Sequence, residues 1–309
     1  MTTVLAAIIK QGLRSVGYYR RALAHMSLPG VAVLCYHGIR DDDTSSGRIP
    51  LDYLHVPAST FERHCRIIRE CCDPISLDDW RAALNAGVPL PKRPVLITFD
   101  DGYRSVLTNA APILAAHSLP ATVFVCTGPM RTRQLLWFDY VGARDGDAVV
   151  QAWKDRDYES WSNAYSEMPR IDEGDPRALM TPDELATLAA MSGIEIGGHT
   201  VRHPILARAS ASDQRWEIEQ NCRDIEQWTG KPARAFAYPN GRPGVDYNAD
   251  TLAILRDAGV DMAFTTRSSF AQADEPCLER SRFFMLSDTS DAELAHRLAY
   301  GWSPELMRA

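Results

Sequence analysis

The stretch VLITFDDGY, residues 95–103, decides the fold of this chain. A short run of apolar and β-branched residues leads into two adjacent aspartates, Asp100 and Asp101, and then into a glycine. Such a run, ended by turn residues, is typical of a buried strand. Two neighbouring carboxylates repel each other, and a nearby cation removes most of that cost. The pair therefore predicts a charged site at this strand end, with further ligands elsewhere in the chain.

Similar apolar runs recur along the chain and alternate with stretches of helical periodicity. We expect strands at residues 31–39, 95–101, 121–127, 194–199, 233–239 and 260–266. We expect helices at residues 57–70, 77–86, 104–117, 211–229 and 248–258. This alternation predicts parallel β/α units in a barrel or a wound sheet, with functional groups at the carboxyl ends of the strands. The alternation of strands and helices is interrupted at residues 128–182, which predict a lid-like insertion.

Composition narrows the class of protein. The 309 residues suit one large α/β domain with extensions. A net charge of −7 argues against nucleic acid as a ligand and leaves neutral substrates open. The seven cysteines are an odd number without CxxC spacing. They argue against a disulfide framework or a cysteine zinc site, and they favour a reducing compartment.

Residues 1–30 predict an amphipathic helical extension with a basic character. The apolar positions are Val4, Leu5, Ile8, Ile9, Leu13 and Val16, and the basic ones are Lys10, Arg14, Arg20 and Arg21. The segment lacks the features of a signal peptide, and its apolar run is too short to cross a bilayer. Such a helix either lies on an anionic membrane surface or packs on the protein's own core. We therefore expect a cytoplasmic protein, with membrane association as one of these two alternatives.

The stretch IEIGGHTVRHPIL places His199 at the end of another predicted strand and His203 four residues later. That spacing lets both imidazoles reach one metal ion from the same side of a turn. Two histidines and one carboxylate form a common catalytic zinc set with positions left for water and substrate. Zinc is the expected ion, and such ligands also accept cobalt, nickel or iron. The alternative is a pair of ordinary turn histidines, which the aspartate pair makes less favourable.

The motifs TFDDGY (98–103) and HTVRH (199–203) resemble the first two motifs of the polysaccharide deacetylases, carbohydrate esterase family four with NodB homology. The resemblance covers residues 31–290. It implies a deformed (β/α) barrel with about seven parallel strands. It also implies one divalent metal ion and hydrolysis of the N-acetyl group of an amino sugar. The remaining residues form the N-terminal extension and a C-terminal helix and tail at 291–309.

Carried over residue by residue, the resemblance assigns Asp100 as general base. It assigns the metal ligands as Asp101, His199 and His203. The stretch AFAYPNG (235–241) resembles the family's third motif, which lines the substrate groove. The resemblance gives three groove residues there, namely Tyr238, Pro239 and Asn240. The backbone N–H of Asn240 would donate to the oxyanion.

Two departures from the family pattern concern the catalytic residues. The third motif commonly carries an arginine that orients the base, and this chain has Ala237 there. We expect Arg280 to replace it, with a surface charge as the alternative. The late Leu-x-His motif is missing, and instead LCYH (34–37) ends the first predicted strand on His37. This layout is similar to the circularly permuted poly-N-acetylglucosamine deacetylases, in which such a histidine is the general acid; the alternative is a packed core histidine.

Three aromatic or acidic residues complete the predicted site. Trp137 and Asp139 either form a sugar-stacking wall or pack within the lid, and Tyr103 borders the groove. The expected activity is metal-dependent N-deacetylation of a free, lipid-linked or polymeric amino sugar. One alternative is a deformylase or another amide hydrolase on the same barrel. The other is a non-catalytic carbohydrate-binding protein.

Overall fold

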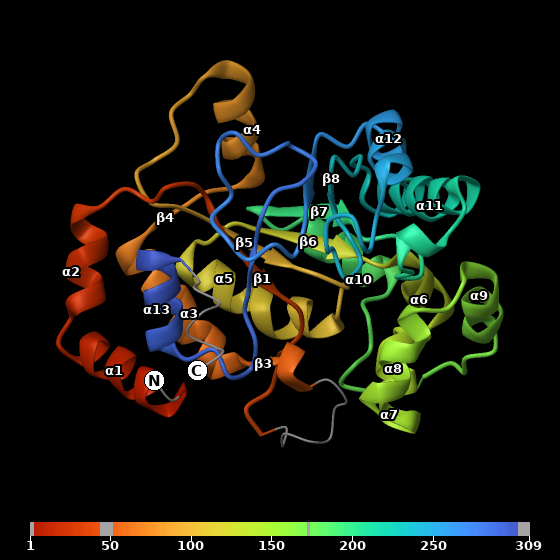
Figure 1. Ribbon diagram of the computed structural model, residues 1–309, viewed down its shortest axis with the longest axis horizontal. Helices are drawn as coiled ribbons and strands as arrows, with labels where there is room; N and C mark the ends of the chain where they lie inside the picture. The colour runs from red at the N-terminus through yellow and green to blue at the C-terminus, as the bar shows by residue number, and fades with distance from the viewer. Residues whose placement is uncertain (1–2, 44–51, 172–173, 302–309) are drawn as a thin grey trace.

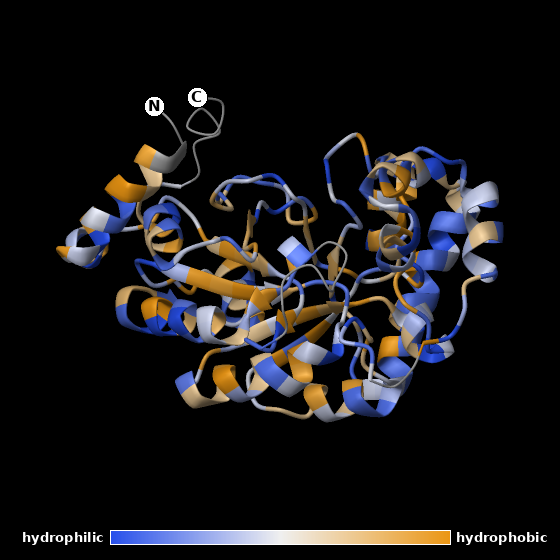
Figure 2. Ribbon diagram, turned by 90° about the horizontal axis from the view of Figure 1, so that it is seen from below, coloured by the Kyte–Doolittle hydropathy of each residue, from blue (hydrophilic) through white to orange (hydrophobic). Residues whose placement is uncertain are grey.

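The computed structural model describes residues 3–43, 52–171 and 174–301. A sheet of parallel strands crosses the middle of the molecule, and helices surround it (Figure 1). The strands are predominantly apolar, whereas the outward faces of many helices are hydrophilic (Figure 2). The predicted tail beyond residue 301 lies outside the described residues.

Seven parallel strands lie side by side in the order β10-β1-β5-β6-β7-β8-β9 and curl into a half-barrel. Their bounds are β1 (Ala32–Tyr36), β5 (Pro94–Phe99), β6 (Ala121–Val125), β7 (Ile194–Gly198), β8 (Ala235–Ala237), β9 (Met262–Phe264) and β10 (Phe283–Phe284). The short β4 (Asp73–Pro74) pairs with β5, while β2 (Ile39–Arg40) and β3 (Val56–Pro57) form a separate pair. The predicted deformed (β/α) barrel is confirmed, and all six predicted strands are present.

Strand β10 was not predicted, and it matters for the site. It pairs with β1, whose other neighbour is β5. The register places Leu34 opposite Phe283 on one side and Ile97 on the other. The first long strand and the last strand of the chain are therefore neighbours. Both β1 and β5 are fully buried, as expected for parallel strands covered on both faces.

The predicted helices between the strands are also present. Their bounds are α3 (Ala58–Cys71), α4 (Leu77–Ala86), α5 (Ala111–His117), α11 (Ala211–Thr229) and α12 (Ala249–Asp257), with α10 (Pro182–Ala189) and α13 (Asp291–Tyr300) in addition. A turn of π-helix, Val106–Ala110, precedes α5. Capping boxes begin α4 at Ser76 and α10 at Thr181, where each side chain satisfies otherwise unpaired backbone N–H groups.

The N-terminal extension consists of two helices rather than one. Helix α1 (Thr3–Ser15) ends before Gly17, which has a φ of 72°, and α2 (Tyr18–His25) follows. Glycine adopts this left-handed conformation without steric cost, so it breaks the helix. One face of α1 contacts α13 through the ion pairs Lys10–Glu293 and Arg14–Asp291. The extension therefore packs on its own barrel through this face.

The insertion between β6 and β7 is helical. It contains α6 (Thr127–Thr132), α7 (Trp137–Asp145), α8 (Asp147–Lys154) and α9 (Tyr158–Ser166). These helices gather at one end of the sheet, away from α1 and α2 (Figure 1). The division of the chain into an extension, a barrel and a tail remains a prediction.

We expect Gly198→Ala to destabilise the fold. A β-carbon at this position in β7 would lie 2.6 Å from Asn221 Oδ1 and 2.9 Å from the Phe236 ring. Overpacking of this kind costs about 1–3 kcal/mol. Urea unfolding measures the effect, with Gly12→Ala as control because no atom lies within 4 Å of its added β-carbon. Equal unfolding midpoints for the two variants would contradict the close packing.

Candidate metal centre and catalytic site

A cavity of about 370 Å³ lies at the carboxyl ends of the strands. Seven of the predicted site residues line it, namely His37, Asp100, Asp101, His199, His203, Tyr238 and Asn240. They follow β1, β5, β7 and β8, and these strands bring together residues that are far apart in the sequence. The structure therefore assembles the predicted metal ligands, base and acid in one cavity.

Unusual backbone conformations position several of these side chains. Asp101, His203 and Asn240 all have positive φ values, of 74°, 60° and 60°. Such conformations cost a non-glycine residue about 1–3 kcal/mol and concentrate at functional sites. Asp100 instead continues the strand, and its N–H donates to Tyr36 O at 2.9 Å. The change of conformation at Asp101 lets two adjacent carboxylates face different partners.

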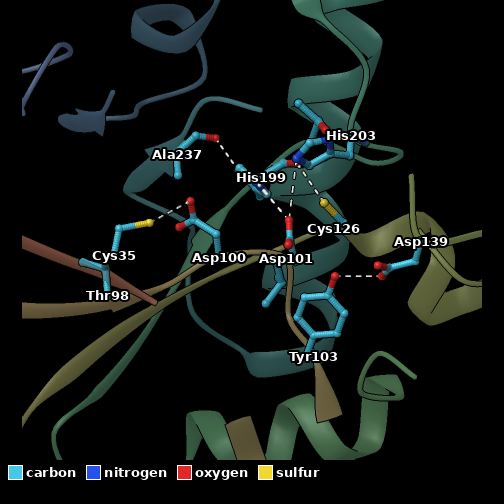
Figure 3. Close-up of polar contacts among 12 residues, drawn as sticks. Cys35, Thr98, Asp100, Asp101, Tyr103, Cys126, Asp139, His199, His203 and Ala237 are labelled. Atoms are coloured by element: carbon cyan, nitrogen blue, oxygen red, sulfur yellow. Dashed lines mark hydrogen bonds and ion pairs between the residues drawn. The ribbon is translucent and has the colours of Figure 1, made fainter. Parts of the chain in front are cut away.

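Asp101 faces the two histidines (Figure 3). Its Oδ1 lies 3.4 Å from His199 Nε2 and 3.6 Å from His203 Nε2, and all three side chains are buried. Neither carboxylate oxygen of Asp101 has a hydrogen-bond partner among the described residues. A buried, ionised carboxylate without partners is costly, and a cation would relieve that cost. Two imidazole nitrogens and one carboxylate oxygen fit a divalent metal of the zinc type.

Surrounding groups fix the orientation of His199. Its Nδ1 lies 2.6 Å from Ala237 O and donates to it, which leaves Nε2 directed at Asp101. Histidine ligands commonly have such a second hydrogen bond, because it sets the tautomer and the ring orientation. The buried Asn221 side chain accepts from His199 N–H at 3.1 Å and donates to Thr200 O at 2.7 Å. Sequence reasoning missed Asn221, because it lies in the middle of a long helix.

Residues of the insertion hold His203. Trp137 Nε1–H donates to His203 O at 2.8 Å, and the Phe138 ring packs edge-on against the imidazole. Burial, aided by His199, lowers the pKa of His203 to about 3. The imidazole is therefore neutral at physiological pH, as metal binding requires.

Asp100 is paired with Arg282. The guanidinium donates to Oδ1 at 2.7 Å and to Oδ2 at 2.8 Å, and both side chains are buried. Burial alone would raise the pKa of Asp100, but the charge of Arg282 and its hydrogen bonds hold that pKa well below its usual range. Asp100 is therefore ionised and fixed in orientation.

Arg282 occupies the position predicted for Arg280, so that prediction is corrected. The Arg280 guanidinium donates to Gln272 O at 2.7 Å and lies over the Trp80 ring. Arg282 directly precedes β10, which pairs with β1 beside β5, and this brings its side chain to Asp100. The signal in the sequence is the Phe283–Phe284 pair after Arg282, which is too short to be recognised as a strand.

His37 follows β1 and lines the cavity. Its ring stacks on Phe284 with centroids 5.6 Å apart, and its buried Nδ1 has no hydrogen-bond partner among the described residues. Burial lowers the pKa of His37, although the charges of Asp101 and Asp100 oppose this effect. His37 is therefore a neutral imidazole at the cavity, available for proton transfer.

Four predicted groove residues do not line the cavity. Trp137 stacks on Trp153 inside the insertion, and Tyr103 donates a hydrogen bond to Asp139 Oδ2 at 2.7 Å in the interior. Burial raises the pKa of Asp139 to about 8. Pro239 is likewise not among the lining residues. For Trp137 and Asp139 the lid-packing alternative is therefore the one observed. Tyr103 is buried and does not line the cavity.

A second group of potential ligands, formed by Cys35, His37 and Asp100, is a weaker metal site. Its donor atoms also lie within 4.8 Å of one another. Arg282 already neutralises Asp100, however, and burial raises the pKa of the Cys35 thiol well above its usual range. A protonated thiol is a poor ligand, since metals bind the thiolate. The group at Asp101 is therefore the better candidate.

The fold and the site define a β/α-barrel protein with a buried Asp-His-His group that could hold a metal. Residues 87–263 match the family model of polysaccharide deacetylases. The chain is 32% identical over 93 residues to an Escherichia coli poly-beta-1,6-N-acetyl-D-glucosamine N-deacetylase, a match that covers 30% of this chain and 13% of that protein's length. It is 23% identical to the putative polysaccharide deacetylase YxkH of Bacillus subtilis, over 79% of this chain and 67% of that protein.

Solved structures share the same fold. The Streptococcus pyogenes deacetylase PplD, in complex with acetate, superposes with a TM-score of 0.64 at 22% identity, covering 88% of this chain and 99% of that one. IcaB from Ammonifex degensii superposes with a TM-score of 0.63 at 20% identity, covering 89% of this chain and 99% of that one. The chain belongs to the polysaccharide deacetylase family, a family of hydrolases.

We expect Arg282→Met to destabilise the protein by about 3–5 kcal/mol at pH 7, because it leaves a buried carboxylate unpaired. In the wild type the lowered pKa of Asp100 contributes stability above its unfolded-state value of 3.8, and that stability is lost as pH falls toward the folded-state value. In the variant the pKa of Asp100 rises. The difference between the two proteins should therefore shrink as pH falls toward about 4.

Urea unfolding at the two pH values measures this difference. The control is Arg234→Met, which removes a partly exposed ion pair with Asp261 and should cost at most about 1 kcal/mol. Equal losses for the two variants would show that the Arg282–Asp100 pair does not support the fold.

Proposed function

We propose that this protein is a metal-dependent N-deacetylase that hydrolyses the N-acetyl group of an amino sugar. One observation carries the proposal. A buried Asp-His-His group with unsatisfied carboxylate oxygens shares a cavity with Asp100, an ionised carboxylate held by an arginine. Membership of the polysaccharide deacetylase family supports the same reaction.

Asp101, His199 and His203 would hold the metal ion, with zinc as the expected species. When bound, a divalent metal lowers the pKa of a water molecule and polarises the amide carbonyl. Cobalt, nickel or iron would suit the same nitrogen and oxygen ligands. The protein contributes a neutral imidazole at His203 and a fixed ring orientation at His199.

Asp100 acts as the general base. It takes a proton from the attacking water at one of its carboxylate oxygens. Each oxygen accepts one hydrogen bond from Arg282, and Oδ2 also accepts one from the Cys35 thiol at 3.5 Å, which leaves the second lone pair of Oδ1 available. A base must be ionised and correctly aimed, and the bidentate arginine provides both properties.

His37 acts as the general acid and gives a proton to the departing amine nitrogen. Stacking on Phe284 fixes its ring at the cavity. Because burial lowers the pKa of His37, the ring begins neutral, and the proton it gives to the amine is the one that Asp100 has taken from the water, so that both residues return to their starting states. The backbone N–H of Asn240, in its left-handed conformation at the cavity, donates to the oxyanion.

A deformylase or another amide hydrolase would use the same residues and would differ only in the acyl group. The apolar side chains of Leu54, Phe138 and Phe284 line the cavity and suit any small acyl group. A non-catalytic carbohydrate-binding protein would need neither an ionised Asp100 nor its arginine. Substrate assays therefore distinguish an N-deacetylase from a deformylase or another amide hydrolase. Substitution of Asp100 distinguishes an enzyme from a non-catalytic carbohydrate-binding protein.

We expect zinc to restore acetate release by chelator-treated protein from at least one N-acetylated sugar or oligosaccharide. Asp100→Asn should lower kcat by about 10²–10⁴-fold because the base is lost, while one metal ion per chain is still bound. Acetate release and metal content are measured on the same samples. The control is Asp155→Asn, which changes an exposed carboxylate.

Three results would count against the proposal. Release from N-formyl but not N-acetyl sugars would favour a deformylase. Unchanged sugar binding by Asp100→Asn, with no turnover by the wild type on any substrate, would favour a binding protein. Full activity after chelation would exclude a metal-dependent reaction.

A further inference from the structure

Lys154 is a cation at the cavity that forms no ion pair with any of the described residues. It ends helix α8 of the insertion, is partly buried, and lines the cavity together with the metal-binding group. No described carboxylate lies within ion-pair distance of its ammonium group. Asp246 is the acidic residue whose charge acts on it, but Arg242 already holds that carboxylate with two hydrogen bonds, of 2.8 and 2.9 Å.

The position of Lys154 relative to the metal ligands limits what could pair with it. Lys154 and His203 line the same cavity. The neighbouring wall is apolar and includes Phe138 and Val150. Partial burial and the nearby Arg242 lower the pKa of Lys154, which shows that its charge is poorly compensated. An anion that pairs with Lys154 would therefore have to be part of the bound ligand.

We infer that Lys154 is a specificity residue that binds an anionic substituent, a phosphate or a carboxylate, on the N-acylated sugar. The inference rests on the proposed function and narrows its substrate class. A neutral polymer would leave Lys154 unpaired in the complex, whereas an anionic sugar would supply the missing charge. Charge-assisted hydrogen bonds of this kind are about twice as strong as neutral ones.

Binding measurements test this inference independently of turnover. The zinc-loaded protein is titrated calorimetrically with N-acetylglucosamine 1-phosphate, with an N-acetylated amino uronic acid, and with the neutral methyl glycoside of N-acetylglucosamine. We expect at least one anionic sugar to bind about tenfold more tightly than the neutral one. Lys154→Met should abolish that preference, and Lys154→Arg should retain it. The control is Lys92→Met, an exposed lysine that does not line the cavity.

The two anionic sugars distinguish phosphate from carboxylate recognition. A preference that survives Lys154→Met would mean that the anion binds the metal instead, and it would overturn the inference. Equal affinities in the wild type would also overturn it. Anion preference without acetate release from any sugar would support the inference and count against the proposed function, so the two failures are distinguishable.

A second, independent observation concerns the N-terminal helices. Large apolar side chains gather on their outer face, namely Leu5, Ile8, Ile9, Val16 and Tyr18, all exposed. Ile8 and Val16 are 62% and 65% exposed, the highest values among the exposed large hydrophobic residues described. The apolar residues of α1 lie at the edge of the molecule (Figure 2). We call this group of five residues the apolar face.

The charge around the apolar face differs from that of the rest of the protein. Residues 1–30 contain four lysines and arginines and no acidic residue, although the whole chain has a net charge of −7. Lys10 and Arg14 are paired with α13, whereas Arg20 and Arg21 are exposed and form no ion pair within the described part of the chain. The corner is therefore apolar and locally basic.

We propose that this corner binds the surface of an anionic lipid bilayer. Exposed apolar residues of α1, followed by exposed arginines of α2, match the boundary between acyl chains and anionic headgroups. A symmetric pairing with a second copy is less favourable, because it would bring the arginines of both copies together. None of the described helices has the length and apolar composition needed to cross a bilayer, so the contact would be interfacial.

Co-sedimentation of the full chain with vesicles tests this proposal. We expect binding to phosphatidylglycerol vesicles and weaker binding to phosphatidylcholine vesicles. Ile8→Glu with Val16→Glu should abolish binding, and Arg20→Glu with Arg21→Glu should remove the preference for anionic lipid. The control is Val88→Glu with Val245→Glu, two exposed apolar residues elsewhere. Absence of vesicle binding, binding that the first pair leaves unchanged, or a dimer that this pair dissociates would overturn the proposal.

Discussion

The structure depends on the need to stabilise two adjacent buried carboxylates at the end of β5. Asp100 and Asp101 are both almost fully buried, and neither can be accommodated there as a bare charge. The left-handed backbone at Asp101 separates them, so that each faces a different partner. Arg282 neutralises Asp100, and the group formed by Asp101 with two histidines could hold a cation. In the proposed function, Asp100 is the base and Asp101 is a metal ligand.

The insertion serves this site in addition to covering it. Trp137 donates to the backbone of His203. The buried Glu217 accepts hydrogen bonds from the N–H groups of Val201 and Arg202, within the loop that carries both histidines. Tyr158 of the insertion also donates to Glu217, at 2.9 Å. The loop that presents the metal ligands is therefore held by the barrel and by the insertion together, which keeps two histidines in position before any ion binds.

The sequence was sufficient to predict the parts of the fold with strong local patterns. Apolar runs located six of the seven strands, and the strand-end motifs located Asp100, Asp101, His199 and His203. The sequence was insufficient where the structure depends on pairing between distant segments of the chain. The two-residue β10 forms only because it pairs with β1, so Arg282 could not be chosen over Arg280. A tryptophan such as Trp137 could stack on a sugar ring. Only its contacts with Trp153 and Trp161 in the folded structure show that it is buried instead.

X-ray absorption spectroscopy of the zinc-loaded protein tests most directly whether Asp101 and the two histidines form the metal site. The account predicts one zinc ion per chain, with two nitrogen ligands and one oxygen ligand from the protein and no sulfur ligand. The nearby group of Cys35, His37 and Asp100 provides the contrast, because it would contribute sulfur. A sulfur ligand in the spectrum, or a spectrum unchanged by Asp101→Ala, would contradict the account.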